Sequence, residues 1–439
     1  NKTYSKMKMR LLYNLGKKKL FPICRSLTGH GSKKTLKIIK KNIGNLKIYN
    51  FLSGSKVYDW VIPAEWNIKD AFVLDKFKKK IIDFKKNNLH LVGYSQPLNK
   101  ILKKKKLLNH IHTLPNQPSA IPYVTSYYKK YWGFCMSHSE KKLIKSKYKD
   151  NDQFKVVIQS SFNKKGKLSI GEYLINGKSS QEIFISTYIC HPSLANDNLS
   201  GVIVSLALIK HFKKIKNLKK TLRFVFLPET IGAIAYLSKN LKTLKSNIIG
   251  GYNLTCLGDE ARHSYMLSKY ANSPSDKSLI EAYKILKIKA KRYSFLERGS
   301  DERQYNSPGV DLPITSMFRS KYGTYKEYHT SLDNFDFITA KGLNESFKVA
   351  KKAIEILMKK TYPISTTLCE PLMSKRGMYP TISNLSKKNI DNFSTHLLDF
   401  LQYADGKNDL DEISKLIKLD RRATDFYKKI LIKNNLIKY

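Results

Sequence analysis

The sequence predicts an α/β fold with a mixed central sheet flanked by helices, extended by a small β-rich insertion and a C-terminal winged helix-turn-helix. Three apolar runs of strand length, which end near Cys190, Leu227 and Phe318, indicate the sheet. Each run is followed by a short polar loop and then by a helix-like segment. This alternation is typical of buried strands in open α/β sheets.

Composition shifts along the chain predict where the core is interrupted. Amphipathic, helix-like stretches such as SKKTLKIIKKNIG lie between residue 1 and about residue 48. From residue 56 to about residue 114, short β-like runs alternate with Gly, Pro and Asn, which favours a small β-rich domain. We therefore expect residues 1–50 and 115–362 to form the core and residues 51–114 the insertion, whose end could fall as late as about residue 150.

The C-terminal part of the chain has the pattern of a separate helical unit. After a linker at 363–380, helical patterns occur at 392–403, 410–417 and 423–434, and the chain ends in the strand-like LIKNNLIKY. Their lengths are those of a helix-turn-helix unit. We expect residues 370–439 to form this domain.

Side chains of the type that bind metals follow the three predicted strands. His191 and Asp197 share the loop after the first strand, Glu229 ends the second, and His329 follows the third within YHTSLD. Ligand sites of open α/β sheets lie at the carboxyl ends of the strands, and imidazole with carboxylate is a ligand set suited to zinc. In isolation, His191 would more simply cap a helix and Asp197 a turn. Three segments of this kind, each with a polar side chain after a strand, together favour a metal site.

At this level of detail the sequence resembles a known superfamily. The order H…DNxSG, a strand ending in Glu, SD, and YHTxxD is similar to the zinc-dependent aminopeptidases and carboxypeptidases with two co-catalytic metals. Longer segments resemble a bacterial branch with an aminopeptidase-like domain, a small inserted domain and a C-terminal winged helix. These segments are LFPICRSLTG (20–29), YDWVIPAEWNIKDA (58–71), HTLP (112–115), AIPYVTSYY (120–128), YWGFC (131–135), CHPSLANDNLSG (190–201), EPLMSKRGMYP (370–380) and YADG (403–406). The resemblance implies a zinc-exopeptidase-like core.

The same resemblance implies roles for individual residues. His191 and His329 match ligands of the two metals, Asp197 matches the carboxylate that bridges them, and Glu229 matches the general base. The chain departs from the pattern at two places, because Thr230 and Thr255 stand where the two-metal enzymes have ligand carboxylates. Each metal would thus lose one ligand.

A single zinc held by His191, Asp197 and His329 is the simplest arrangement that these residues permit. Asp259, which follows Thr255 closely, is an alternative source of a further ligand. Asp301 is either a further ligand, a carboxylate that orients a ligand histidine, or an anchor of its own loop.

Three more residues are candidates for binding the substrate. Arg298 and Tyr328 would hold a substrate carboxylate or polarise a carbonyl, although a loop arginine is more often only a solvated charge. Glu302 replaces the histidine of the superfamily's Ser-Asp-His element and is counted with them.

The composition excludes several classes of protein. Lys and Arg number 81 against 34 Asp and Glu, a formal net charge of +47, but the lysines are spread along the whole chain. That spread favours a solvated surface over a nucleic-acid footprint. No apolar run approaches the roughly 18 residues of a membrane span. The five cysteines are scattered, and the N-terminal residues lack a signal-like apolar core, so we expect a cytoplasmic protein.

We therefore expect a zinc-dependent hydrolase of amide bonds, with Glu229 as general base. Its substrate would be a peptide, an amino-acid amide, or an N-acyl or aminoacyl sugar, the last because the branch that it resembles occurs in polysaccharide biosynthesis contexts. The alternative is a winged-helix DNA-binding regulator, or a scaffold, with a degenerate peptidase domain. The sequence leaves a homo-oligomer open.

Overall fold

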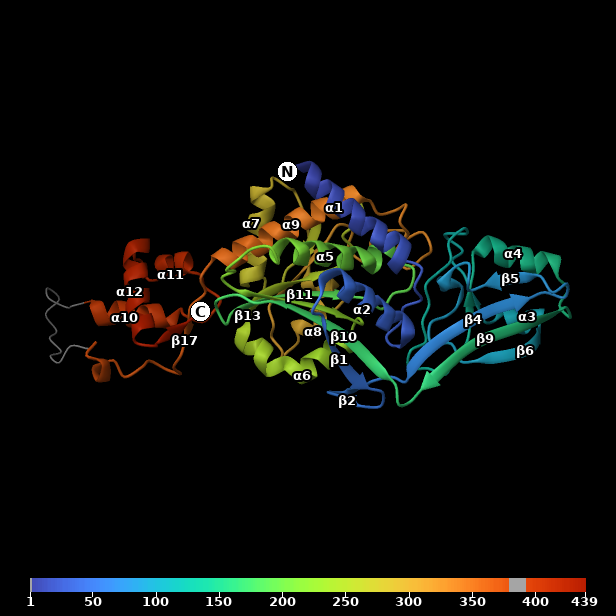
Figure 1. Cartoon of the computed structure of the whole chain (residues 1–439), viewed down its shortest axis with the longest axis horizontal. Helices are drawn as coiled ribbons and strands as arrows, with labels where there is room; N and C mark the ends of the chain where they lie inside the picture. Colours follow the sequence, from blue (N-terminus) through green and yellow to red (C-terminus); the bar gives the residue numbers. More distant parts are fainter. Residues whose placement is uncertain (1, 379–391) are drawn as a thin grey trace.

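An eight-stranded mixed sheet forms the centre of the protein (Figure 1). The computed structural model describes residues 2–378 and 392–439. Four neighbouring strands of the sheet, β12, β11, β13 and β16, run parallel to one another. Across the sheet the order is β1 (Lys47–Leu52), β10 (Lys167–Ile175), β12 (Thr221–Leu227), β11 (Glu182–Tyr188), β13 (Ile248–Leu254), β16 (Ile314–Phe318), β14 (Ser264–Met266) and β15 (Lys291–Tyr293). The mixed sheet expected from the sequence is confirmed.

Helices cover both faces of this sheet (Figure 1). One face carries α1 (Lys2–Leu15), α2 (Gly29–Ile43), α5 (Ser200–Phe212), α7 (Pro274–Ile285) and α9 (Ala340–Lys359), and the other carries α6 (Ile231–Asn247) and the short α8 (Glu302–Tyr305). The helix α5 is buried around most of its circumference, which explains its nearly continuous apolar sequence. Each face of the sheet therefore has its own apolar core.

One ion cluster lies inside the core on the α6 side. The Arg223 guanidinium on β12 lies 2.6 Å from Glu182 Oε2 and 2.6 Å from Glu172 Oε2. Tyr236 of α6 donates a second hydrogen bond to Glu172. All four side chains are buried, so the two carboxylates depend on this one cation for their charge balance.

A second, antiparallel sheet forms the insertion. It consists of β5 (Lys80–Asp83), β4 (Glu65–Leu74), β9 (Gln153–Asn163) and β6 (Leu98–Lys103), in that order. The strand β9 completes this sheet. The insertion therefore extends past residue 114 and past residue 150, the two positions at which we expected it to end. The reason is that residues 155–163 of β9 pair with β4 before the chain turns into β10. Two helices lie between β6 and β9 in the sequence. The first, α3 (Lys104–Leu108), packs on β6 and β9, and the second is α4 (His138–Lys147).

The chain leaves and re-enters the central sheet at one point. β1 and β10 are adjacent antiparallel strands, and Leu52 at the end of β1 is paired with Lys167 at the start of β10. The Ser53 amide also donates to the Gly166 carbonyl at 3.0 Å. Short strands β2 (Lys56–Val57) and β3 (Trp60–Val61) begin the inserted part.

The C-terminal unit contains the three expected helices, α10 (Phe393–Gln402), α11 (Leu410–Leu416) and α12 (Arg421–Lys433). The terminal strand β18 (Ile437–Lys438) is present and pairs with β17 (Ile364–Ser365), which lies in the expected linker. Residues 379–391 are outside the described chain, including the last two residues of that linker. Two ion pairs join the unit to the core: Lys360 with Asp409 at 2.9 Å and Lys277 with Glu412 at 2.7 Å.

Among residues 2–378 and 392–439, the helices are all too short or too polar to span a bilayer.

The buried ion cluster gives a first testable prediction. Arg223→Met leaves two carboxylates buried without a cation, so we expect a loss of about 3 to 5 kcal/mol, or a melting temperature lower by about 5 to 10 °C. Thermal unfolding followed by circular dichroism measures this. Lys219→Met, at an exposed position just before the same strand, is the matched control and should melt with the wild type. Equal melting of both variants would contradict the assigned charge balance.

Candidate metal centre

The predicted ligands meet at the carboxyl edge of the parallel strands. His191 and Asp197 lie in the loop between β11 and α5, and His329 lies in the loop between β16 and α9. One nitrogen of each histidine and one oxygen of Asp197 all lie within 4.8 Å of one another. Among the described residues these three form the group suited to a metal ion. The sheet thus joins side chains that are more than 100 residues apart in the sequence.

The atoms of this group are arranged around one point. Asp197 Oδ2 lies 3.0 Å from His329 Nε2 and 3.9 Å from His191 Nε2. His329 Nε2 is buried, yet within the described chain it has no partner with the geometry of a hydrogen bond. A buried ring nitrogen without a partner is costly, and a metal ion between the three groups would satisfy it. Two imidazoles and a carboxylate fit zinc.

The protonation states of the group suit metal binding. Burial lowers the pKa of His191 to about 4, so this ring is neutral at neutral pH. Burial alone would raise the pKa of Asp197, but His191, His329 and Tyr188 outweigh it and hold the pKa at about 2. A metal ligand must be deprotonated, and both groups already are.

A shell of hydrogen bonds fixes the loop that carries His191 and Asp197. Tyr188 donates to Asp197 Oδ1, and the Asp333 carboxylate accepts the backbone amides of Asn196 and Asp197 at 2.6 and 3.0 Å. The buried Arg25 donates from Nε to the His191 carbonyl at 2.9 Å. The sequence alone assigned no role to Tyr188, Asp333 or Arg25. Arg25 and Asp333 lie inside motifs that carry the family resemblance, but a motif alone does not show which backbone atom a side chain reaches.

Glu229 stands beside this group. Its Oε2 lies 3.7 Å from His191 Nε2, and its Oε1 accepts a hydrogen bond of 2.7 Å from the Ser300 hydroxyl. Burial raises the pKa of Glu229 well above its usual range, and the nearby Asp301 and Asp197 raise it further. A carboxyl group with a raised pKa next to a metal centre can both take up and release a proton near neutral pH.

Hydroxyl groups occupy the two places where the superfamily has further carboxylates. Thr230 Oγ1 accepts a hydrogen bond of 2.6 Å from Arg303 Nη2, and Thr255 Oγ1 lies 2.6 Å from the Tyr188 hydroxyl. Both hydroxyls are therefore engaged by protein groups. Arg303, which sequence reasoning did not single out, introduces a positive charge close to Glu229.

The two aspartates proposed as further ligands lie elsewhere. The Asp259 carboxylate accepts hydrogen bonds from Asn196 Nδ2 at 3.0 Å and from the amide and hydroxyl of Ser320. It anchors loops and is not part of the metal group. Asp301 Oδ1 accepts the Thr230 amide at 2.7 Å, which ties the Glu229 segment in place. Burial raises the pKa of Asp301 to about 7.

The three substrate-binding candidates have different surroundings. Arg298 is exposed and lies over the Phe295 ring. Glu302 is buried, and both its oxygens are occupied: Oε1 accepts the Gly299 and Ser300 amides, and Oε2 accepts Asn253 Nδ2. It supports the loop that carries Ser300. Tyr328 alone lies at the metal group, with its ring stacked on His329 at 3.9 Å between centroids.

Comparison with solved structures defines the class of the core. The chain is similar to a zinc aminopeptidase from Bacillus subtilis, with a TM-score of 0.59 and 12% identity over 81% of this chain and 95% of that one. It is also similar to a peptidase M28 precursor from Shewanella amazonensis, with a TM-score of 0.53 and 12% identity over 82% and 98%. The core therefore has the aminopeptidase-like fold.

Closer matches define the family. Residues 13–360 match the model of DUF4910, a domain of unknown function, and residues 360–439 match a winged helix-turn-helix. A Clostridium acetobutylicum protein, provisionally named a polysaccharide biosynthesis protein with an aminopeptidase-like domain, is 42% identical over 433 residues, 97% of this chain and 96% of that one. A crystal structure of a protein from the same species, provisionally named a peptidase, matches with a TM-score of 0.78 and 38% identity over 99% and 97%. The chain belongs to the DUF4910 family and ends in a winged helix.

The ligand set predicts the metal content. We expect about one zinc per chain by elemental analysis, because one group of three ligands is present and Thr230 and Thr255 are engaged elsewhere. His191→Ala and His329→Ala should each lose the metal, whereas His30→Ala, at an exposed histidine, should keep it. Two tightly held zinc ions per chain would contradict this prediction.

Proposed function

We propose that this protein is a zinc-dependent hydrolase that cleaves an amide bond, with one zinc held by His191, Asp197 and His329. The observation that carries the proposal is the buried His329 Nε2, which lies 3.0 Å from Asp197 Oδ2 without the geometry of a hydrogen bond, with the Glu229 carboxyl beside them. The aminopeptidase-like fold supports it. A ligand set alone would suit a structural metal, but a free carboxyl group at its edge suits catalysis.

Glu229 and Ser300 have separate roles in the proposed hydrolysis. When bound, zinc lowers the pKa of a coordinated water and polarises a carbonyl group. Glu229 takes a proton from the attacking water through Oε2 and returns it to the nitrogen of the leaving amine. The Ser300 hydroxyl holds Oε1 at 2.7 Å, so the free oxygen stays turned toward the metal group. The amide C–N bond breaks as the amine gains that proton.

The chemistry of the site limits the substrate to a compound with an amide bond. Peptides, amino-acid amides, and N-acyl or aminoacyl sugars all satisfy this requirement. The name of the Clostridium acetobutylicum relative joins an aminopeptidase-like domain to polysaccharide biosynthesis. That combination supports testing amide-bearing sugars beside peptides.

The role of Glu229 is tested by removing its charge. Glu229→Gln keeps the size and the hydrogen bond to Ser300 but cannot accept the proton, so hydrolysis should fall by roughly 10² to 10⁴ with zinc retained. Turnover of a panel of amide substrates and elemental analysis measure the two effects. Glu370→Gln, an exposed position in the segment before the C-terminal helices, should leave both unchanged. Full activity of the Glu229→Gln variant would exclude this role.

A second candidate function, DNA binding, arises from the winged helix-turn-helix. The helix α12 begins with Arg421 and Arg422, which could face nucleic acid. However, Arg421 is paired with Asp411 and with Asp425 at 3.2 Å, and Lys428 is paired with Asp425 at 2.8 Å. Two of the basic side chains on this helix are therefore already neutralised. We place enzyme function first and expect the winged helix to serve in docking.

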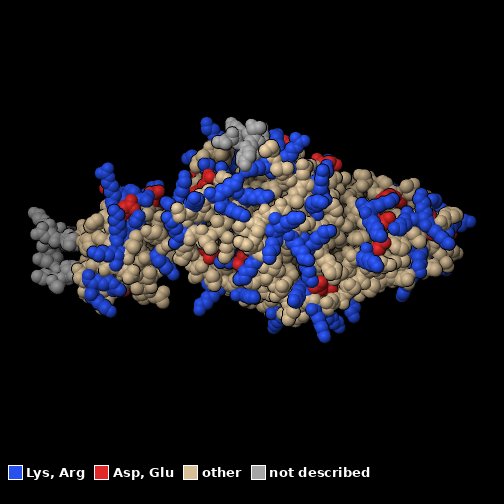
Figure 2. Space-filling view, in the orientation of Figure 1, with Lys and Arg blue, Asp and Glu red and all other residues tan. Residues whose placement is uncertain are grey.

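The distribution of positive charge over the surface supports this order. On the face shown in Figure 2, lysine and arginine side chains lie over the C-terminal unit, the core and the insertion alike. A sequence-specific DNA-binding surface would instead gather them on one face of the winged helix. The charge therefore favours a general attraction to polyanions over recognition of one DNA site.

Salt dependence separates these two functions. Scattered lysines attract phosphate without contacting bases, so we expect nucleic-acid binding to be weak, indifferent to sequence, and lost steeply as salt rises. Replacing Arg421 and Arg422 together by alanine should change little beyond the slope of that dependence. Gel-shift assays at several salt concentrations measure it. A salt-resistant complex with one DNA sequence, abolished by the double replacement, would instead identify a regulator.

A further inference from the structure

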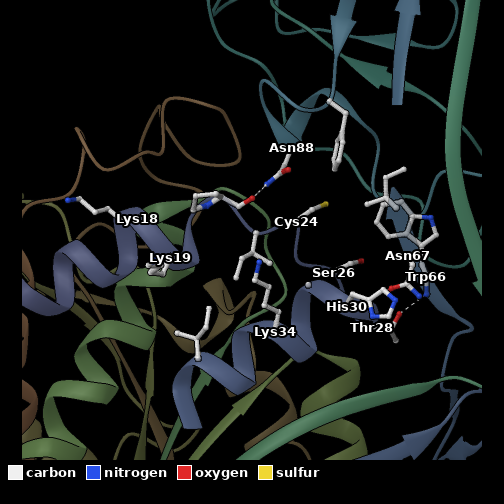
Figure 3. A pocket seen from close by; sticks show the side chains of 16 residues that line it. Lys18, Lys19, Cys24, Ser26, Thr28, His30, Lys34, Trp66, Asn67 and Asn88 are labelled. Atoms are coloured by element: carbon white, nitrogen blue, oxygen red, sulfur yellow. Dashed lines mark hydrogen bonds between the residues drawn. The ribbon is translucent and has the colours of Figure 1, made fainter. Parts of the chain in front are cut away.

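A cavity lies between the core and the insertion, away from the metal ligands (Figure 3). Its volume is about 590 Å³, which is within the usual range for small-molecule sites. The core contributes the first turns of α2 and the segment 22–28 that precedes it, and the insertion contributes β4 and the loop around Asn88. None of His191, Asp197 and His329 lines it. It is therefore a separate site.

The cavity is basic on one side. Lys18, Lys19, Lys34 and His30 line it, and none of the described residues that line it is acidic. Figure 3 shows Lys34 reaching up from α2 toward the segment that carries Cys24. The neighbouring Lys33 is neutralised by Glu65 at 2.8 Å, whereas no ion pair is found for Lys34 within the described chain. The charge of Lys34 is thus available to a ligand.

Hydrogen bonds join the start of α2 to the insertion beside this cavity. Thr28 precedes the helix but does not cap it, because its hydroxyl accepts the Trp66 amide and bonds to Tyr94 instead. The Asn67 side chain of β4 accepts the His30 amide in the first turn of α2 at 2.7 Å, so the insertion already caps this end of the helix.

A second, independent observation is Ser26. It lies between Cys24 and His30 on the cavity wall (Figure 3). The residue is 4% exposed, and its hydroxyl has no hydrogen-bond partner within the described chain. A buried hydroxyl left without a partner is costly, and an acceptor in the cavity would satisfy it.

The wall that the insertion contributes is apolar and aromatic, with Trp66, Ile68 and Phe84. A ligand that fills the whole cavity therefore combines an anionic group at the α2 end with a flat or apolar portion. We propose that this cavity binds a small molecule that carries a phosphate group, held by Lys34 and Ser26. This site is additional to the proposed hydrolase function and does not depend on it.

The probe for this site is phenyl phosphate, which has both an anionic end and a flat ring. Isothermal titration calorimetry of the full-length protein should give saturable binding with a Kd at or below about 1 mM. Phenol, which lacks the phosphate group, should give none. Absence of saturable binding by phenyl phosphate would overturn the proposal.

Matched variants separate a built site from diffuse charge attraction. Lys34→Ala should weaken binding about 10-fold, because it removes a charge-assisted contact. Ser26→Ala should weaken it about 3-fold or more. Lys41→Ala removes the same charge from the far end of the same helix and should change the Kd by less than about twofold. Equal effects of Lys34→Ala and Lys41→Ala would overturn the proposal.

A chelator control excludes the metal centre as the source of the signal. Phosphate groups also bind zinc, so the titration is repeated after dialysis of the wild-type protein against a metal chelator. We expect the same Kd within about twofold, because the metal ligands do not line the cavity. Loss of binding on metal removal would assign the phosphate to the metal centre and overturn the proposal.

Discussion

The burial of the Asp197 charge is the constraint on which the rest of the site depends. This carboxylate is 1% exposed, and a buried charge destabilises a fold unless it is compensated. The compensation comes from Tyr188 at the end of β11, from His329 in a loop two strands away, and from His191 in its own loop. Two of these three groups, His191 and His329, are also proposed ligands of the metal, so the fold that stabilises the buried charge also brings the proposed ligands together.

The other acidic groups around Asp197 respond to its negative charge. Burial raises the pKa of Glu229 well above its usual range, and the nearby Asp301 and Asp197 raise it further. Burial together with the charge of Asp197 raises the pKa of Asp333 to about 8. Several carboxylates so close together do not all ionise, because each charge opposes the next. Asp197 carries the negative charge, while Glu229 remains able to gain a proton. The proposed ligand Asp197 and the proposed base Glu229 are both carboxyl groups, and their different surroundings give them different proton affinities.

The sequence predicted the parts of this arrangement that depend on periodicity and residue type. Buried strands ending in His191, Glu229 and the segment before His329 could be recognised because parallel strands of an α/β sheet are apolar on both faces. The end of the insertion could not, because the alternating pattern of β9 is compatible with either sheet and only its pairing with β4 decides. Glu302 could not be assigned correctly either. Its carboxylate faces backbone amides of its own loop, and sequence spacing does not show that direction.

The pairing of β1 with β10 has a consequence for how the insertion relates to the core. Two adjacent antiparallel strands are normally joined by a tight hairpin turn. Here Leu52 and Lys167 face each other across that junction, so the whole inserted domain takes the place of a turn of a few residues. The pairing of β1 with β10 in the central sheet therefore involves no residue of the insertion. The insertion therefore stands at the tip of a hairpin, a place where residues can be added or removed while the register of the central sheet stays unchanged.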